Sequence, residues 1–148
     1  MTIERILVIG AGTMGRQIAM SCPLSGYTTV LQDISSDALS AARKELEGWV
    51  ASRVAKGKLA QADADAALNN LTQSTDLEDS ASNADLVIEA AVERLDIKEQ
   101  IFATLGEKAP AHAILATNSS TPCLPLAWPK PAAALSRYAT CTSSIPRW

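Results

Sequence analysis

Apolar residues along this chain follow two alternating patterns. Short apolar runs are separated by longer segments in which apolar positions recur every few residues. Successive side chains alternate across a strand but repeat about every 3.6 residues around a helix, so the runs predict strands and the segments predict helices. The predicted strands cover residues 3–9, 28–33, 71–75, 85–90 and 113–117. The predicted helices cover residues 13–22, 36–56, 61–69 and 95–108.

This alternation predicts an α/β fold, with a doubly wound, mainly parallel sheet that carries helices on both faces. In such a sheet the ligand lies beyond the carboxyl ends of the strands. The segments that follow each predicted strand are therefore the first places to look for binding residues.

A glycine-rich turn follows the first predicted strand directly and opens the first predicted helix. Gly10 permits a tight turn, Gly12 lets the backbone approach a pyrophosphate, and Gly15 lets the helix pack closely on the strand. The N–H groups of the helix's first turn and the positive end of the helix dipole favour phosphate binding. This context predicts a Rossmann-type dinucleotide site. Its predicted cofactor-binding residues are Gly10, Ala11, Gly12, Thr13, Met14 and Gly15.

An acidic residue ends the second predicted strand. Asp33 lies 18 residues after Gly15, close to the spacing of about 20 expected for the acid that binds the adenosine ribose. Its carboxylate would accept hydrogen bonds from the ribose hydroxyls and repel a 2′-phosphate, which favours NAD over NADP. The alternative role, capping the next helix, fits Ser35, Ser36 and Asp37 better.

Length and composition narrow the function classes. A chain of 148 residues with 47% hydrophobic content predicts a single domain with one core. The net charge of −3, without a clustered basic face, gives no reason to expect a nucleic-acid partner. No apolar run approaches the roughly 20 residues that span a membrane, and no signal peptide precedes the first strand, so a cytoplasmic protein is expected. The three cysteines, which show no metal-ligand spacing and are expected to be reduced, are Cys22, Cys123 and Cys141.

Two further stretches sharpen the interpretation. One, Ala84–Lys98, leaves the fourth predicted strand and enters a helix, and the other, Ile114–Ser120, leaves the fifth. Together with the glycine turn they resemble the NAD-binding domain of the L-3-hydroxyacyl-CoA dehydrogenases, especially the 3-hydroxybutyryl-CoA branch. The resemblance covers residues 1 to about 121.

The resemblance implies roles for individual residues. Glu93 and Lys98 match positions that line the cofactor site, and Asn118 matches one near the nicotinamide. Ser120 matches a serine that hydrogen-bonds the substrate's 3-oxygen, and Lys56 falls where the family contacts a CoA phosphate. Structural alternatives stay open: Lys56 as a solvated lysine at a helix end, Glu93 with Lys98 as a surface pair, and Ser120 as a helix cap.

The catalytic histidine of that family has no counterpart in this chain. In the family a glutamate holds a histidine that exchanges a proton with the substrate oxygen, and this histidine belongs to a His-Phe motif after the Asn-Ser-Ser turn. The single histidine here, His112, precedes that turn. We interpret it as a solvated loop residue.

Composition changes abruptly after residue 120. Residues 121–148 hold five of the seven prolines but no glycine and no acid, and we expect no strand there. One hypothesis is a frameshifted remnant: codons permitted for Thr140–Ser143 read Leu-His-Phe in another phase. The alternative is a genuine proline-rich extension that docks on a partner.

These observations predict a Rossmann NAD-binding domain at 1–120, an atypical tail at 121–148, and no helical C-terminal domain for substrate binding and dimerisation. The expected function by resemblance is NAD-dependent hydride transfer at C3 of a short-chain 3-hydroxyacyl-CoA or 3-ketoacyl-CoA, in a chain that is itself disabled. The expected partners are an acyl-CoA substrate and, through exposed apolar surface, a second copy of the chain. Two alternatives are a gulonate-type hydroxy-acid dehydrogenase and a non-catalytic NAD-binding module.

Overall fold

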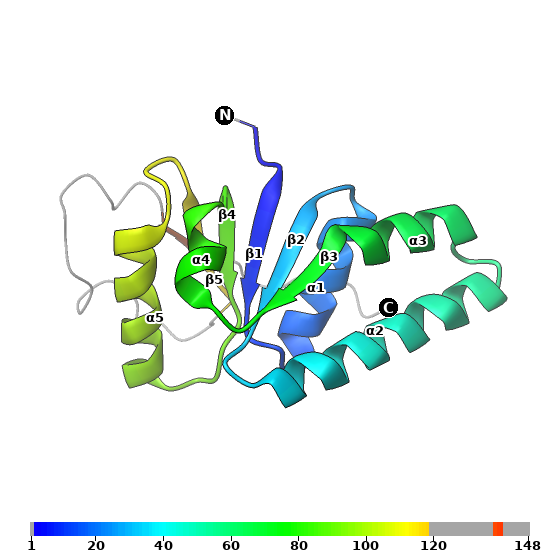
Figure 1. Ribbon diagram of the computed structural model, residues 1–148, viewed down its shortest axis with the longest axis horizontal. Helices are drawn as coiled ribbons and strands as arrows, with labels where there is room; N and C mark the ends of the chain where they lie inside the picture. Colours follow the sequence, from blue (N-terminus) through cyan, green and yellow to red (C-terminus); the bar gives the residue numbers. More distant parts are fainter. Residues whose placement is uncertain (1, 119–137, 141–148) are drawn as a thin grey trace.

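The computed structural model describes residues 2–118 and the backbone of residues 138–140. One sheet runs through the centre, and the carboxyl ends of its strands lie along the lower edge in Figure 1. The strands are β1 (Arg5–Ile9), β2 (Thr28–Gln32), β3 (Leu71–Ser74), β4 (Leu86–Glu89), β5 (Ile114–Thr117) and β6 (Tyr138–Thr140). The helices are α1 (Thr13–Leu24), α2 (Ser36–Ala55), α3 (Gln61–Asn70), α4 (Leu77–Ser82) and α5 (Leu95–Lys108).

The strand order is β3-β2-β1-β4-β5-β6, and every neighbouring pair is parallel. The chain moves outward from β1 to β3, then crosses back to β4 beside β1 and moves outward on the other side. The order therefore reverses between β1 and β4, and this switch point is where a doubly wound sheet binds its ligand. This topology confirms the predicted fold class.

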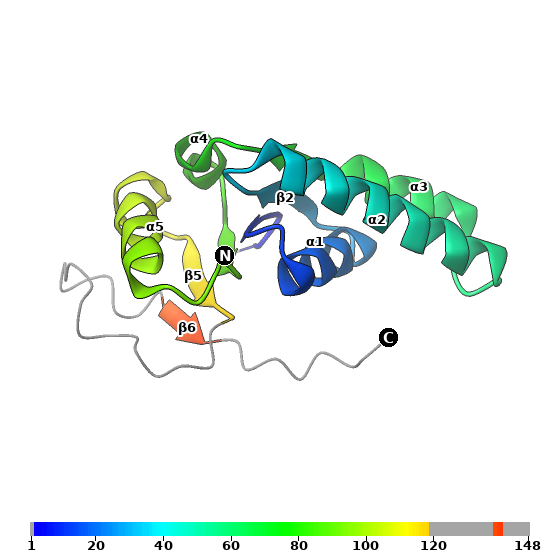
Figure 2. The same ribbon diagram turned by 90° about the horizontal axis from the view of Figure 1, so that it is seen from below.

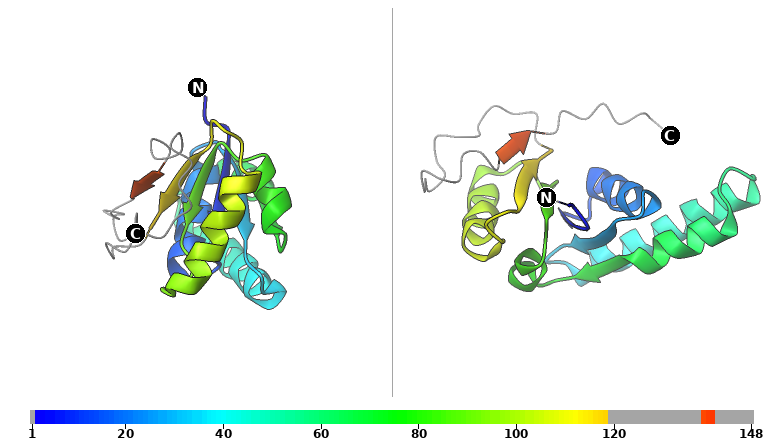
Figure 3. Two further views of the ribbon diagram at one scale, coloured as in Figure 1. Left: turned by 90° about the vertical axis from the view of Figure 1, so that its left-hand side faces the viewer. Right: turned by 90° about the horizontal axis from the view of Figure 1, so that it is seen from above.

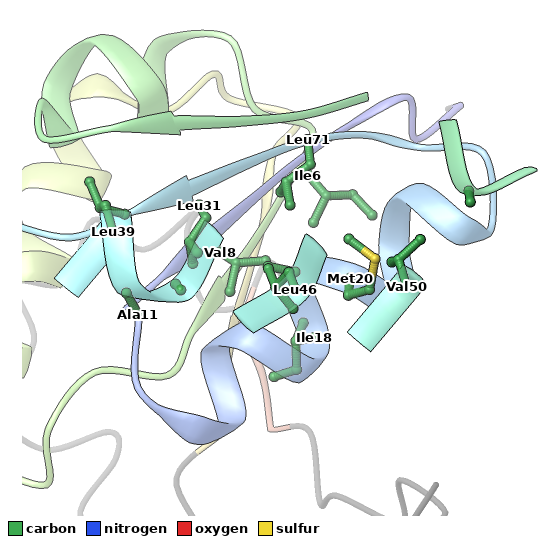
Figure 4. Close-up of a cluster of buried hydrophobic side chains, with 13 residues drawn as sticks. Ile6, Val8, Ala11, Ile18, Met20, Leu31, Leu39, Leu46, Val50 and Leu71 are labelled. Carbon is green, nitrogen blue, oxygen red and sulfur yellow. The ribbon is translucent and has the colours of Figure 1, made fainter. Parts of the chain in front are cut away.

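Helices cover both faces of the sheet, with α4 and α5 on one side and α1, α2 and α3 on the other (Figure 2). Strand β1 shows the consequence: Ile6 and Val8 belong to one buried cluster, and Leu7 and Ile9 belong to another. Adjacent strand residues point to opposite faces, so a strand covered on both sides is apolar throughout. Figure 4 shows the first cluster, in which side chains of α1 and α2 pack on β1 and β2.

The second helix extends well beyond the sheet. It has 20 residues, about 30 Å at the usual rise per residue. It packs along α3, and the turn that joins the two helices projects away from the β3 edge (Figures 1 and 3). That turn therefore lies far from the carboxyl edge, where α2 begins.

Three local features differ from the predictions. Helix α4 was not predicted, because six residues are too few to show a helical repeat; the Asp76 side chain caps it by accepting a hydrogen bond from the Asp79 N–H at 3.0 Å. Helix α1 continues through Pro23 to Leu24, two residues past the predicted end. The prediction of no strand in the tail is wrong for β6, whose three non-proline residues extend the sheet by pairing with β5.

Candidate functional site

The glycine turn joins β1 to α1 at the carboxyl edge of the sheet. Gly10 has a φ of 102°, and a Cβ there would lie 2.6 Å from the Ala90 carbonyl oxygen. A Cβ on Gly15 would collide with the carbonyl oxygen of Gly10, whereas a Cβ on Gly12 would meet nothing within 4 Å. Gly10 and Gly15 are thus required by the packing of the turn, and Gly12 borders open space.

The first turn of α1 is open to an anion. Gly12 occupies the N-cap position, with no side chain bonded there and no acidic residue in the first turn. By contrast, Ser35 caps α2, because its hydroxyl accepts a hydrogen bond from the Ala38 N–H at 3.2 Å. The N–H groups that begin a helix have no partner within it, and the helix dipole adds positive potential there. The start of α1 can therefore hold a phosphate group.

Asp33 connects β2 to the glycine turn. One carboxylate oxygen accepts a hydrogen bond from the Ala11 N–H at 2.8 Å, and the other accepts one from the Ser35 N–H at 2.9 Å. The first contact was not predicted, since it joins residues 22 apart in the chain. Ser35 rather than Asp33 is the N-cap of α2, as expected. The next residue, Ile34, is 91% exposed and presents apolar surface at the same edge.

A buried carboxylate ends β4, and the sequence analysis missed it. Glu89 is fully buried; Oε1 accepts a hydrogen bond from the Ala91 N–H at 2.7 Å, and Oε2 accepts one from the Thr117 hydroxyl at 2.6 Å. The Lys98 Nζ lies 3.4 Å from Oε2. A charged residue inside the apolar run of the fourth predicted strand was the available signal.

Three of the predicted site residues gather around Glu89. Lys98 lies between Glu89 and Glu93, with its Nζ 3.5 Å from Glu93 Oε1. The Lys98 side chain is only 13% exposed, whereas that of Glu93 is 65% exposed, so Lys98 is not simply half of a surface pair. The Asn118 N–H donates to the Glu89 carbonyl oxygen at 2.8 Å.

Other candidate residues lie elsewhere. Lys56 follows the last residue of α2, exposed on the projecting turn and remote from the carboxyl edge. Exposed His112 lies before β5 at the amino end of the sheet, as the solvated-loop interpretation predicted. Burial raises the pKa of the Cys22 thiol to about 11, so this thiol stays protonated at neutral pH. Ser120, Cys123 and Cys141 lie outside the described residues.

These features define a class of protein. A parallel, doubly wound sheet, an uncapped first helix behind a glycine turn, and an acid at the end of β2 are the elements of a Rossmann-type dinucleotide-binding domain. The residues present fit such a cofactor, because open space at Gly12 adjoins the free N–H groups of α1.

Comparison with known proteins narrows the class to one family. Residues 5–125 match the family described as "3-hydroxyacyl-CoA dehydrogenase, NAD binding domain". The chain belongs to this family. The match ends close to residue 121, where the resemblance was predicted to stop.

Relatives and solved structures agree with this assignment. Over 119 residues the chain is 41% identical to 3-hydroxyadipyl-CoA dehydrogenase of Escherichia coli K12, covering 80% of this chain and 25% of the relative. It is 36% identical over 121 residues to a probable 3-hydroxybutyryl-CoA dehydrogenase of Bacillus subtilis, covering 82% and 42%. The crystal structure of an Escherichia coli 3-hydroxybutyryl-CoA dehydrogenase superposes with a TM-score of 0.83 at 36% identity, covering 95% and 29%. The chain thus spans less than half the length of these relatives. Within its described part, no helix is both long and apolar enough to cross a membrane.

Proposed function

We propose that this chain binds NAD(H) at the carboxyl edge of its sheet, as the cofactor-binding part of a 3-hydroxyacyl-CoA dehydrogenase. The observation that carries the proposal is the open, uncapped start of α1 at Gly12, next to the carboxylate of Asp33. NAD, when bound, accepts or supplies the hydride that is exchanged with C3 of a short-chain 3-hydroxyacyl-CoA or 3-ketoacyl-CoA.

Each residue of the edge has a task in this proposal. The N–H groups of Gly12, Thr13 and Met14 hold the pyrophosphate, and Asp33 accepts hydrogen bonds from the adenosine ribose while keeping its bond to Ala11. On the other side of the switch point, Glu93, Lys98 and Asn118 face the rest of the cofactor. Lys56 is proposed as a CoA-phosphate contact and depends on a substrate long enough to reach the α2–α3 turn.

Turnover by this chain is proposed to be very low. Ser120 is assigned the hydrogen bond to the substrate's 3-oxygen, but residues 121–148 hold no histidine to exchange a proton. Loss of a general acid typically costs about 10² to 10⁴ in rate. NADH oxidation by acetoacetyl-CoA should therefore stay near the uncatalysed rate even where NADH binds.

Titration with NADH, followed by its fluorescence, tests the binding site. In Gly12→Ala the new methyl group meets no protein atom, so the fold should survive while it blocks close approach of the pyrophosphate. Gly106→Ala on α5, also with nothing within 4 Å, is the matched control. We expect Gly12→Ala to lose most NADH affinity without a lower melting temperature, and Gly106→Ala to keep it. Equal NADH affinity in the two variants would reject the site.

We further propose that residues 121–148 are a shifted reading of sequence that in relatives continues the dehydrogenase. The family match ends at residue 125, just where prolines replace glycines and acids. Re-reading the coding DNA from residue 115 in all three phases tests this. A single-base correction that restores Leu-His-Phe and a long helical extension would support it, and a faithful frame would favour a docking tail.

Location and assembly belong to the same proposal. A cytoplasmic location rests on the reduced state expected for the three cysteines, and cell fractionation tests it. Association of the chain with itself rests on exposed apolar side chains such as those of Ile34 and Val92, which are 91% and 59% exposed. A clean monomer in light scattering would contradict it.

A further inference from the structure

Glu89 is a buried charge to which the proposed function gives no task. It is the only carboxylate among residues 2–118 that is fully buried, at 0% exposure. Burying a charge is costly, and a buried ion pair is often no more stabilising than well-packed apolar residues of similar volume. Fold stability alone is therefore a weak reason for a glutamate at this position.

The contacts of Glu89 converge on the carboxyl edge. Its carboxylate accepts hydrogen bonds from the Ala91 N–H in the β4–α5 loop and from the Thr117 hydroxyl on β5, and it lies beside the Lys98 ammonium on α5. Its carbonyl oxygen accepts a hydrogen bond from the Asn118 N–H. One residue thus fixes the positions of three segments that end at the site.

The same segment abuts the glycine turn. The Ala90 N–H donates to the Ile9 carbonyl oxygen at 2.8 Å, and the Ala90 carbonyl oxygen occupies the space that a side chain on Gly10 would need. Backbone atoms of Ala90 make these contacts without the Glu89 carboxylate, so they hold the glycine turn in place when that carboxylate is changed.

We infer that Glu89 is a positioning residue for the half of the dinucleotide that lies on the β4–β5 side of the switch point. The inference rests on the proposed NAD(H) site. A doubly wound sheet holds its cofactor across the switch point, with the adenosine half on the side of β2 and Asp33. Glu89 acts on the other half, since its charge holds Lys98 and its hydrogen bonds hold the residues next to Asn118.

Binding of NADH and ADP-ribose to Glu89→Gln tests the inference. The amide keeps the shape: its oxygen can accept from the Ala91 N–H while its NH2 donates to the Thr117 hydroxyl, but the charge that holds Lys98 is removed. ADP-ribose carries the adenosine and pyrophosphate without the nicotinamide. We expect NADH affinity to fall about tenfold or more, the usual effect of losing a charge-assisted contact, and ADP-ribose affinity to change less than about twofold. Asp85→Asn, at the opposite end of β4, is the matched control and should leave the ratio of the two affinities unchanged.

A double variant shows whether Glu89 acts through Lys98. If it does, Glu89→Gln should weaken NADH binding little further in a Lys98→Met background, because coupled residues give non-additive effects. Thr117→Ser should bind NADH like the wild type, and Thr117→Val should not.

The outcomes separate the two proposals. Wild-type protein that binds neither ligand rejects the proposed function and this inference with it. Wild-type binding together with an unchanged Glu89→Gln, or with equal losses for NADH and ADP-ribose, overturns the inference alone.

Discussion

The two ends of β4 each carry a carboxylate, and the two differ in burial and in what they hold. Asp85, just before the strand, accepts hydrogen bonds from the Glu4 and Arg5 N–H groups and contacts His112 Nε2 at 2.9 Å. Glu89, the last residue of the strand, bonds Ala91, Thr117 and Lys98. Both residues tie β4 to neighbouring segments, but the Asp85 side chain is 18% exposed and that of Glu89 is 0% exposed.

The contacts of Asp85 at the amino end stabilise the fold, whereas those of Glu89 lie at the candidate site. At the amino end of the sheet, solvent reaches Asp85, so its charge costs little and strengthens the start of three segments. At the carboxyl end, the charge of Glu89 is buried beside Lys98 and Thr117, on segments that we propose contact the cofactor. A buried charge depends on every partner being present, which makes the carboxyl end less tolerant of substitution.

The largest effect is expected at Glu89. Glu89→Ala removes the buried carboxylate that pairs with the Lys98 ammonium and accepts a hydrogen bond from the Thr117 hydroxyl, and breaking a buried pair in this way typically costs about 3 to 5 kcal/mol. Urea unfolding measures the change. The triple variant Glu89→Leu, Thr117→Val, Lys98→Met should recover much of the lost stability but not NADH binding. A Glu89→Ala protein as stable as Asp85→Ala would remove the contrast between the two ends.

One glycine at each end of the sheet tests the same difference between the carboxyl end and the amino end. Gly15→Ala forces a methyl group against the Gly10 carbonyl oxygen, and such overpacking costs about 3 kcal/mol when backbone must move. Gly26→Ala, in the turn before β2, meets no atom but places alanine at a φ of 91°, which costs about 1 kcal/mol. Thermal melts should rank them in that order. The reverse order would mean that α1 can shift away from the turn at little cost.

Lowering the pH should weaken the contacts of Asp85 at the amino end of the sheet. Hydrogen bonds from the Glu4 N–H, the His112 side chain and the Arg5 N–H lower the pKa of Asp85 from 3.8 to about 2. Because the folded-state pKa lies below the unfolded value, this carboxylate contributes its full stabilisation above about pH 4 and loses it as the pH falls towards 2. Asp85→Asn should cost about 1 to 2 kcal/mol at pH 7 and progressively less below pH 4. Urea unfolding of both proteins at pH 7 and pH 3 measures this, and a constant difference would contradict it.

His112 should matter least. Its ring contacts Asp85 from an exposed turn, and exposed pairs contribute about 0 to 1 kcal/mol. His112→Ala should therefore lower stability by at most about 1 kcal/mol and leave NADH binding unchanged. A change in NADH affinity would show that the amino end communicates with the site.

The local order of the fold could be predicted from the sequence. The apolar runs placed five strands, the glycine spacing placed the turn between β1 and α1, and the position of Asp33 placed an acid at the end of β2. These signals are local, because strand and helix repeats and the demands of a tight turn act within a few residues. Helix α4 gave no such signal, since six residues hold fewer than two turns.

The tertiary structure alone decided how the carboxyl edge is assembled. Glu89 meets Thr117 across 28 residues, and Asp33 meets Ala11 across 22, because parallel pairing brings the ends of β1, β2, β4 and β5 to one edge. Strand β6 likewise exists through its pairing with β5 rather than through any apolar run of its own. Sequence patterns fix which segments become strands and helices, whereas side-chain partners at one edge are set by the order in which the strands lie.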